Sequence, residues 1–422
     1  MAWNRQAPEL GVKPLPPSIS RWAIVLLGAL FAGVLLFLLY AAFAPLQRVN
    51  VWLLCAMPAL TAVLALAARA YKYGGALGRF EYQQAMAVHA QQAWQAWGQQ
   101  GMAVLASCLM LPDQVSASAV MPSGQALPSR MGQVRRLDKL QGTGNARMHA
   151  AIEQLMDALD SQLSALSPDP NLNVTLLTDV APDEYAAVRE QWVRSWARLN
   201  TPLQPASITV AAALSPQWID EQLKVVSTAI ELVVVLQISG GRAYSDGLAA
   251  LVLSPRARAE KLGEKPEPLW LRPMPLQAES LEQEFALYVR TQTPARDATS
   301  LLADRVDWQP LMVRLLAAGH DSCALTPNDQ VILETLCGLP GPLGHWLASV
   351  LAIELARRRE QPLLLLTLDG PQRWISTITL GHRYEGLNSL FGVPDGLTDD
   401  GIDKSKDRHE RHTASHRYRL HL

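Results

Sequence analysis

The sequence predicts a layered α/β domain that follows a hairpin of two membrane-spanning helices. Three observations lead to this fold class: two long apolar runs near the N-terminus, short apolar strands that alternate with helices from residue 101 onward, and a charged C-terminal segment in which the alternation stops. Continuous apolar strands are typical of sheets that helices cover on both faces.

Two apolar runs, 22–44 and 49–68, contain no charged residue. Each is long enough to cross a hydrocarbon layer of about 30 Å as a helix. The connection, 45–48, is too short for a domain, so the two runs predict a helical hairpin. A buried core helix or a cleaved signal peptide would account for one such run, but here a second run follows at once.

Basic residues indicate the orientation of this hairpin. The connection carries Arg48, whereas the outer flanks carry Arg5, Lys13, Arg21, Arg69, Lys72 and Arg79. Because basic residues are retained on the cytoplasmic side, we expect a multi-pass protein of the bacterial inner membrane with both termini in the cytoplasm. The segment 1–21 is then cytoplasmic, 69–100 forms a helical stalk, and 101–384 forms a cytoplasmic domain.

Composition narrows the possible functions. The net charge is −1, so no general electrostatic attraction to nucleic acid is expected. Cys55, Cys108, Cys323 and Cys337 lack the spacing of a disulfide framework or a zinc site. We therefore expect no cofactor and no metal ion.

Strands and helices alternate through 101–384. A strand at 101–111 opens the domain, and Ser215 followed by Pro216 has the N-cap and first-turn proline that begin a helix. Further strands are expected at 173–178, 207–213, 230–239, 248–254, 362–368 and 373–380, and helices at 148–166, 182–199, 280–291, 308–318, around 327–337 and at 344–359. The alternation occurs twice, over 170–254 and 320–380, which predicts two related halves without an evident residue-level repeat.

Two polar segments lie outside this alternation. The first, 113–146, carries Arg130, Arg135, Arg136 and Lys139 and predicts an exposed loop, with contact to phosphate or lipid headgroups as the alternative. The second, 385–422, is a charged tail that we expect to be disordered. Its His409, His412 and His416 have no packed surroundings to orient them, so no metal site is expected there.

Two stretches resemble β-ketoacyl synthases, enzymes of the thiolase fold. In IELVVVLQISGGRAYSDGLAALVLSP (230–255), a buried strand ends in Gly-Gly, a linker carries Asp-Gly, and a second strand follows. In GPLGHWLASVLAIELARRREQPLLLLTLDG (341–370), a Gly-His pair enters an alanine-rich helix that is followed by a strand and a glycine turn. The resemblance covers 170–382, with 101–111 as the opening strand, and implies a thiolase-like domain with two related halves.

The resemblance also implies where a catalytic site would lie. In the family, the histidine of Gly-His helps to polarise the substrate carbonyl beside a cysteine nucleophile, and this role falls on His345. The nucleophile is expected within 211–215, where the sequence AAALS offers Ser215 as its only hydroxyl and no cysteine. His320 lacks the Gly-Thr-Gly context of the family's other histidine.

Two further family features are altered. The lysine before Gly-His is replaced by Leu-Pro-Gly-Pro, and the glycine-rich loop is reduced to Asp-Gly-Pro-Gln at 369–372. Because such groups act as a unit, the sequence predicts that the protein is not an enzyme and that His345 caps or packs its helix.

The expected function is accordingly that of a membrane-anchored scaffold or adaptor. The architecture is similar to that of accessory proteins of type VI secretion systems. A homodimer and protein partners in the cytoplasm or in a membrane complex are expected by analogy.

Two alternatives stay open. One is a membrane-tethered acyl-thioester transferase that uses Ser215, Cys337 or Cys323 as its nucleophile. The other is a binding module that keeps the acyl tunnel as a lipid or peptide pocket.

Overall fold

The computed structural model describes residues 3, 11–43, 51–121, 127–166, 171–199, 201, 203–225, 229–261, 268–320 and 322–380. The chain divides into two units, Met1–Gly381 and His382–Leu422, and every described residue belongs to the first. The predicted tail, 385–422, lies outside the described residues.

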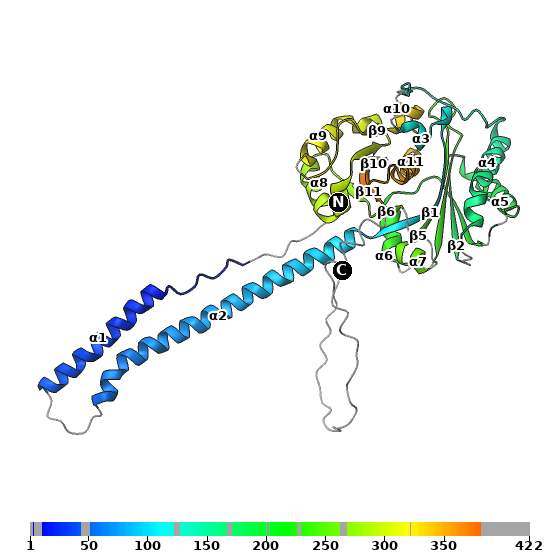
Figure 1. Cartoon of the computed structure of the whole chain (residues 1–422). Helices are drawn as coiled ribbons and strands as arrows, with labels where there is room; N and C mark the ends of the chain where they lie inside the picture. The colour runs from blue at the N-terminus through cyan, green and yellow to red at the C-terminus, as the bar shows by residue number, and fades with distance from the viewer. Residues whose placement is uncertain are drawn as a thin grey trace, which may run out of the picture. The chain divides into compact units, whose positions relative to one another are not determined.

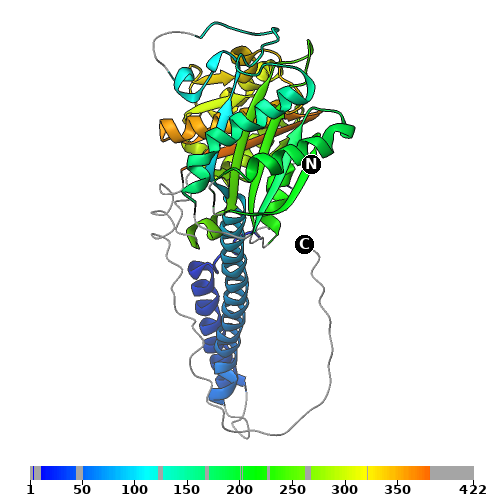
Figure 2. The ribbon, with the colours of Figure 1, turned by 90° about the vertical axis from the view of Figure 1, so that its right-hand side faces the viewer.

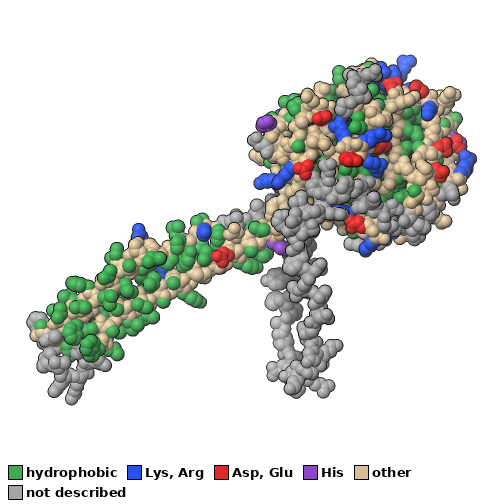
Figure 3. Space-filling model, in the orientation of Figure 1, with side chains coloured by type: hydrophobic (Ala, Val, Ile, Leu, Met, Phe, Trp, Pro, Cys, Tyr) green, Lys and Arg blue, Asp and Glu red, His purple; other side chains and the backbone are tan. Residues whose placement is uncertain are grey.

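Two helices form the N-terminal part, α1 (Ile19–Phe43) and α2 (Val51–Gly98). They pack closely at Gly33, where a Cβ would lie 2.5 Å from the carbonyl oxygen of Cys55. Within the described part of the chain, Ile19–Tyr40 is long and apolar enough to cross a membrane, judged by length and composition. Almost none of its side chains is buried by the rest of the chain, and Figure 3 shows apolar side chains covering this region.

The predicted second span, 49–68, begins in residues outside the described part. From Val51 it continues as the first part of α2, which runs without interruption to Gly98.

The rest of the described chain folds around a mixed sheet of eleven strands (Figure 1). The first half contains β1 (Gly101–Met110), β2 (Leu172–Thr178), β3 (Pro205–Ala211), β4 (Ile230–Gln237) and β5 (Gly247–Pro255). The second contains β6 (Leu269–Leu271), β7 (Met274–Leu276), β8 (Ser300–Ala303), β9 (Gln330–Ile332), β10 (Leu363–Asp369) and β11 (Gln372–Thr379).

The helices of this domain are α3 (Ala117–Val120), α4 (Gly144–Ser164), α5 (Tyr185–Trp196), α6 (Gln217–Lys224), α7 (Arg256–Lys261), α8 (Leu281–Thr291), α9 (Gln309–Gly319), α10 (Leu333–Cys337) and α11 (Gly344–Arg359). The segment 327–337, predicted as helical throughout, instead holds the short strand β9 followed by α10.

The strand order is the same in both halves, read outward from the centre. The complete order is β3-β2-β4-β5-β1-β6-β11-β10-β8-β9, so the first strands of the two halves, β1 and β6, pair antiparallel at the middle. Strand β7 pairs with β11 beside this path, so the five strands of the second half that match β1 to β5 are β6, β8, β9, β10 and β11. With the strands of each half numbered in this way, the second lies parallel to the third and fourth, and the fifth is antiparallel to the fourth. The predicted fold class, a thiolase-like layered α/β domain with two related halves, is therefore confirmed.

A residue-level repeat accompanies this order. The second strand of each half ends in Leu-Leu-x-Asp, at 176–179 and at 301–304. In both halves the amide of the aspartate bonds to the fourth strand, from Asp179 to the Leu236 carbonyl at 3.4 Å and from Asp304 to the Leu366 carbonyl at 3.2 Å.

The two aspartate carboxylates also have equivalent partners. Each accepts amide hydrogens from the end of its own fourth strand: Ile238 and Ser239 donate to Asp179 at 3.1 and 2.7 Å, and Leu368 donates to Asp304 at 2.9 Å. The two halves thus share this local hydrogen-bonding pattern as well as their strand order.

The helices form three layers around the two half-sheets (Figures 1 and 2). Helices α4 and α5 pack on the outer face of the first half, and α8 and α9 on that of the second. Helix α11 lies between them and contacts strands of both halves. Most of its side chains are buried on all sides of the helix. This burial agrees with its sequence, which has apolar residues on every face up to the arginines of the last turn.

We predict a pH-dependent contribution of Asp304 to stability. Burial raises its pKa to about 7, although the Leu368 amide and the Trp308 indole donate to the carboxylate and oppose the shift. The unfolded carboxyl ionises near 3.8, so unfolding releases a proton and the folded state loses stability as pH rises from about 4 to about 7.

Asp304→Asn should therefore give a shallower decline in the free energy of unfolding over this range, measured by denaturation of the full chain in detergent. Asp183→Asn, at an exposed position, is the control. An unchanged slope in Asp304→Asn would contradict the prediction.

Candidate functional site

A pocket of about 470 Å³ lies where the two halves meet. Its lining comes from the turn that begins α6, the segment from β6 to β7, the start of β11, and one residue near the N-terminus. These residues are Trp3, Ser215, Gln217, Asp220, Pro273, Pro275, Gln372 and Trp374. Apolar rings form part of the wall and hydroxyl, amide and carboxylate groups form the rest, as is common in ligand sites.

Ser215 lies half-buried in this pocket, just before α6. The Gln217 amide donates to its Oγ at 3.4 Å, and Pro216 supplies no amide hydrogen to the turn. The hydroxyl is therefore at a helix N-terminus, where backbone dipoles favour developing negative charge.

His345 lies against the same turn. Its side chain is 2% exposed, and its Nε2 is 3.0 Å from the carbonyl oxygen of Leu214, the residue before Ser215. Because a carbonyl only accepts, Nε2 carries the proton; the Trp346 indole donates to the same oxygen at 2.7 Å. The structure thus brings His345 beside the predicted nucleophile turn.

The protonation of His345 follows from its surroundings. Burial lowers its pKa, while the bond to Leu214 and the charge of Asp369 act in the opposite direction. With Nε2–H engaged at Leu214, this nitrogen is not free to take the proton of the Ser215 hydroxyl. The imidazole therefore positions the turn that presents Ser215.

Trp374 contributes its ring to the pocket wall, and its indole nitrogen lies behind that wall. Its side chain is 6% exposed, and its buried Nε1 has no hydrogen-bond partner among the described residues. Gln217 and Gln372 line the same pocket and carry amide groups. Each of these side-chain amides already donates one hydrogen bond, Gln217 to Glu221 and Gln372 to the Arg373 carbonyl, and has a second hydrogen that a bound carbonyl could accept.

Arg272 lies buried behind the pocket and bonds to residues on both α6 and the end of α2. Its side chain is 1% exposed and pairs with Asp220 on α6, and its Nη2 donates to Gln100 Oε1 at 2.6 Å. Its Nε donates to the Trp97 carbonyl at 3.2 Å, and its guanidinium lies 4.2 Å from the centre of the Trp97 ring. Arg272 therefore joins the end of α2 to α6.

The other predicted nucleophiles lie elsewhere. Cys337 is buried in the core at the end of α10, and burial raises its pKa, which disfavours the reactive thiolate. Cys323 is half-buried in the second half, where burial also raises its pKa. Neither is among the residues that line the pocket, and His320 is exposed at the end of α9.

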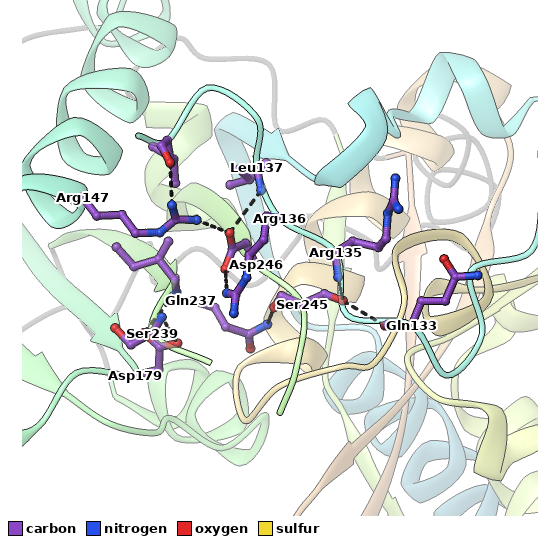
Figure 4. Close-up of polar contacts among 12 residues, drawn as sticks. Gln133, Arg135, Arg136, Leu137, Arg147, Asp179, Gln237, Ser239, Ser245 and Asp246 are labelled. Carbon is purple, nitrogen blue, oxygen red and sulfur yellow. Dashed lines mark hydrogen bonds and ion pairs between the residues drawn. The ribbon is translucent and has the colours of Figure 1, made fainter. Parts of the chain in front are cut away.

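The described part of the 113–146 segment is largely an exposed or half-buried loop before α4 begins, as predicted, and its three arginines are paired with carboxylates. The buried carboxylate of Asp246 accepts from Arg136 at 2.5 Å, from Arg147 and from the Leu137 amide at 3.1 Å (Figure 4). Arg130 and Arg135 pair with Asp113. Because carboxylates already neutralise these arginines, the cluster fastens the segment to the domain.

Comparisons with known proteins identify no family. No protein-family model matches the chain, and no curated protein matches it. The solved structures with similar folds include a type II PKS acyl-carrier protein in complex with its ketosynthase (12% identity, TM-score 0.42, 67% of this chain and 100% of that chain). Others are a tetronic acid condensing enzyme (17%, 0.38, 65% and 98%) and the ishigamide ketosynthase/chain length factor (12%, 0.41, 67% and 99%).

One prediction from the sequence needs correction. We expected that the protein is not an enzyme, but the solved structures that resemble it include ketosynthases, a condensing enzyme and an acyltransferase. Such distant similarity assigns no activity to this chain. The expectation of inactivity is nevertheless withdrawn, and the altered family motifs do not establish it.

We predict that His345 makes stability depend on acid pH. The unfolded imidazole takes up a proton below about 6.5, whereas the buried imidazole has a lowered pKa, so the folded state loses stability as pH falls through that value. In denaturation experiments, His345→Gln should reduce this loss of unfolding free energy at acid pH. His345→Ala should lower the free energy of unfolding by about 2–4 kcal/mol, because it leaves a cavity and removes the bond to Leu214. His320→Gln, at an exposed position, should change neither the free energy of unfolding nor its dependence on acid pH. A His345→Gln variant that loses as much stability at acid pH as the wild-type chain would contradict the prediction.

Proposed function

We propose that this protein is a membrane-tethered acyl-thioester transferase whose pocket holds the acyl group at Ser215. The observation that carries the proposal is the placement of the Ser215 hydroxyl. It lines a pocket between the two halves, at the N-terminus of α6, on a turn that His345 holds by a bond to Leu214.

The pocket has the chemistry for such a ligand. The rings of Pro273, Pro275 and Trp374 offer apolar surface to an acyl chain, and the amides of Gln217 and Gln372 can orient the thioester carbonyl. In the proposed step the Ser215 oxygen bonds to the acyl carbon, the carbon–sulfur bond breaks, and the serine proton leaves with the thiol. The dipole of α6 favours the charge that develops on the attacking oxygen.

A trapping experiment tests this step. The full chain in detergent, incubated with an acyl-coenzyme A, should gain the mass of one acyl group on the peptide that contains Ser215. Ser215→Ala should abolish the adduct, because no other described residue of the pocket lining carries a hydroxyl.

The matched control is Ser322→Ala, which removes an exposed hydroxyl and should leave the adduct intact. An adduct that persists in Ser215→Ala, or none in the wild-type chain, would overturn the proposal.

For the membrane anchor, we propose a hairpin of 22–44 and 49–68 in a bacterial inner membrane with both termini in the cytoplasm. Under this proposal 1–21 is a cytoplasmic segment, 69–100 a stalk, 101–384 the cytoplasmic domain and 385–422 a tail. The exposed apolar surface of α1 and the basic flanks support it. The uninterrupted course of α2 from Val51 to Gly98 suits a stalk that joins the anchor to the domain.

The anchor proposal predicts that the full chain stays in the membrane fraction after alkaline extraction. Protease added to the outer face of spheroplasts should leave both ends intact, because neither end crosses the membrane. Release on alkaline extraction would contradict anchoring, and cleavage of either end from outside would contradict the topology.

A second candidate function is that of an adaptor in a type VI secretion membrane complex, with a homodimer and protein partners as further predictions. The junction of α2 with the domain through Arg272 favours it, because a domain fixed to its anchor suits the presentation of a partner at the membrane. Crosslinking in cells before the same extraction should then recover other membrane-complex proteins. Recovery of this chain alone would count against the adaptor role.

A further inference from the structure

One side of helix α2 already has a partner within the chain. The residues on this side are buried or half-buried: Ala62, Leu66, Tyr73, Leu77, Phe80 and Trp94. Near the start of α2, Cys55 lies against Gly33 of α1, and near its end the Trp94 indole donates to Thr291 of α8 at 3.0 Å. The chain itself therefore covers this side of α2.

The opposite side of α2 is exposed. It carries a row formed by Tyr71, Gly75, Gly78, Tyr82, Ala85 and His89. The spacing along this row alternates between four and three residues, which is the repeat of the contact seam in a coiled coil. With the same spacing the row continues to Met57 in one direction and to Ala96 in the other, always at exposed positions.

The composition of this row suits contact with a copy of itself. None of its six residues is an aspartate, glutamate, lysine or arginine, so two copies would face each other without like-charge repulsion. Tyr71 is 85% exposed and Tyr82 is 67% exposed. A Cβ atom added to Gly75 or Gly78 would meet no described atom within 4 Å.

Small residues flank each tyrosine in the row: Ala68 and Gly75 flank Tyr71, and Gly78 and Ala85 flank Tyr82. In a parallel seam, each side chain enters a hole whose walls include the preceding and following row positions of the other helix. Glycine weakens a helix interior relative to alanine, but it lets a second helix approach closely. Each tyrosine ring would therefore find room beside the backbone of the other copy.

We propose that α2 pairs in parallel with α2 of a second copy of this chain, through the row that contains Tyr71, Tyr82 and Ala85. The parallel orientation rests on the membrane anchor proposed above, because copies anchored by the same hairpin extend in the same direction from one membrane. Anchoring also raises the effective concentration of the two helices.

The length of the row is sufficient for a stable contact. From Met57 to Ala96 the helix rises about 60 Å, at 1.5 Å per residue. With a helix width of about 10 Å, two copies would together bury on the order of 1,200 Å². Stable protein interfaces begin at about this area. The row thus supplies a specific surface for the predicted homodimer.

Disulfide crosslinking of the full chain in membranes tests the pairing. Ala85→Cys places a thiol in the row, and Ala90→Cys, the matched control, places one at an exposed position of α2 outside the row. After mild oxidation, Ala85→Cys should give at least about tenfold more disulfide-linked dimer, because the bond requires Cβ atoms within about 4.5 Å of each other. The wild-type chain controls for the native cysteines.

A charge in the row should separate the copies. Tyr82→Glu, added to Ala85→Cys, should lower the dimer yield about tenfold, because two carboxylates would then oppose each other across the contact. Gln84→Glu introduces the same charge at an exposed position outside the row and should leave the yield unchanged.

Equal dimer yields from Ala85→Cys and Ala90→Cys would overturn the pairing. So would a disulfide from Ala85→Cys to a different protein, because another partner would then cover the row. Alkaline extraction of the same membranes tests the anchor separately. Crosslinked dimer released by the extraction would contradict the anchor and support the pairing, whereas a retained chain without dimer would overturn the pairing alone.

Discussion

The buried ion pair between Arg272 and Asp220 is the interaction on which the pocket region depends. A guanidinium removed from water needs its hydrogens satisfied, and here Asp220, Gln100 and the Trp97 carbonyl accept them. These partners belong to α6 and to the end of α2. One buried charge therefore connects α6, which lines the pocket, to the end of α2.

The position of the pocket follows from the duplicated architecture. Both half-sheets bury a face against α11, and α6 and α11 occupy equivalent places between the third and fourth strands of their halves. The starts of these two helices, with Ser215 and His345, consequently meet at the seam. The equivalent aspartates, Asp179 and Asp304, bond the end of the second strand to the fourth strand in the same way in each half.

Much of this frame is predictable from local sequence. Helix α11 has the bounds expected for it, and the buried strands β4, β5, β10 and β11 differ from prediction by one or two residues at their ends. These strands were recognisable because short apolar runs bounded by turn residues are typical of buried strands. The meeting of His345 with the Ser215 turn was implied by the resemblance to β-ketoacyl synthases. Strand β9 was missed because three residues carry no period, and it was taken into a helix.

The rest depends on contacts between distant parts of the chain. The sequence around Trp3, Arg272 or Asp246 does not predict which residue each one contacts, because the contacted residues are far away along the chain. The Leu-Leu-x-Asp repeat was a readable signal for the duplication but is too short to stand out alone. The most direct measurement is photo-crosslinking of the full chain with a diazirine-bearing acyl-coenzyme A, mapped by mass spectrometry. We predict crosslinks on the peptides that hold Ser215 and Trp374; crosslinks confined to α1 and the apolar part of α2 would contradict the central claim that this pocket receives the acyl group.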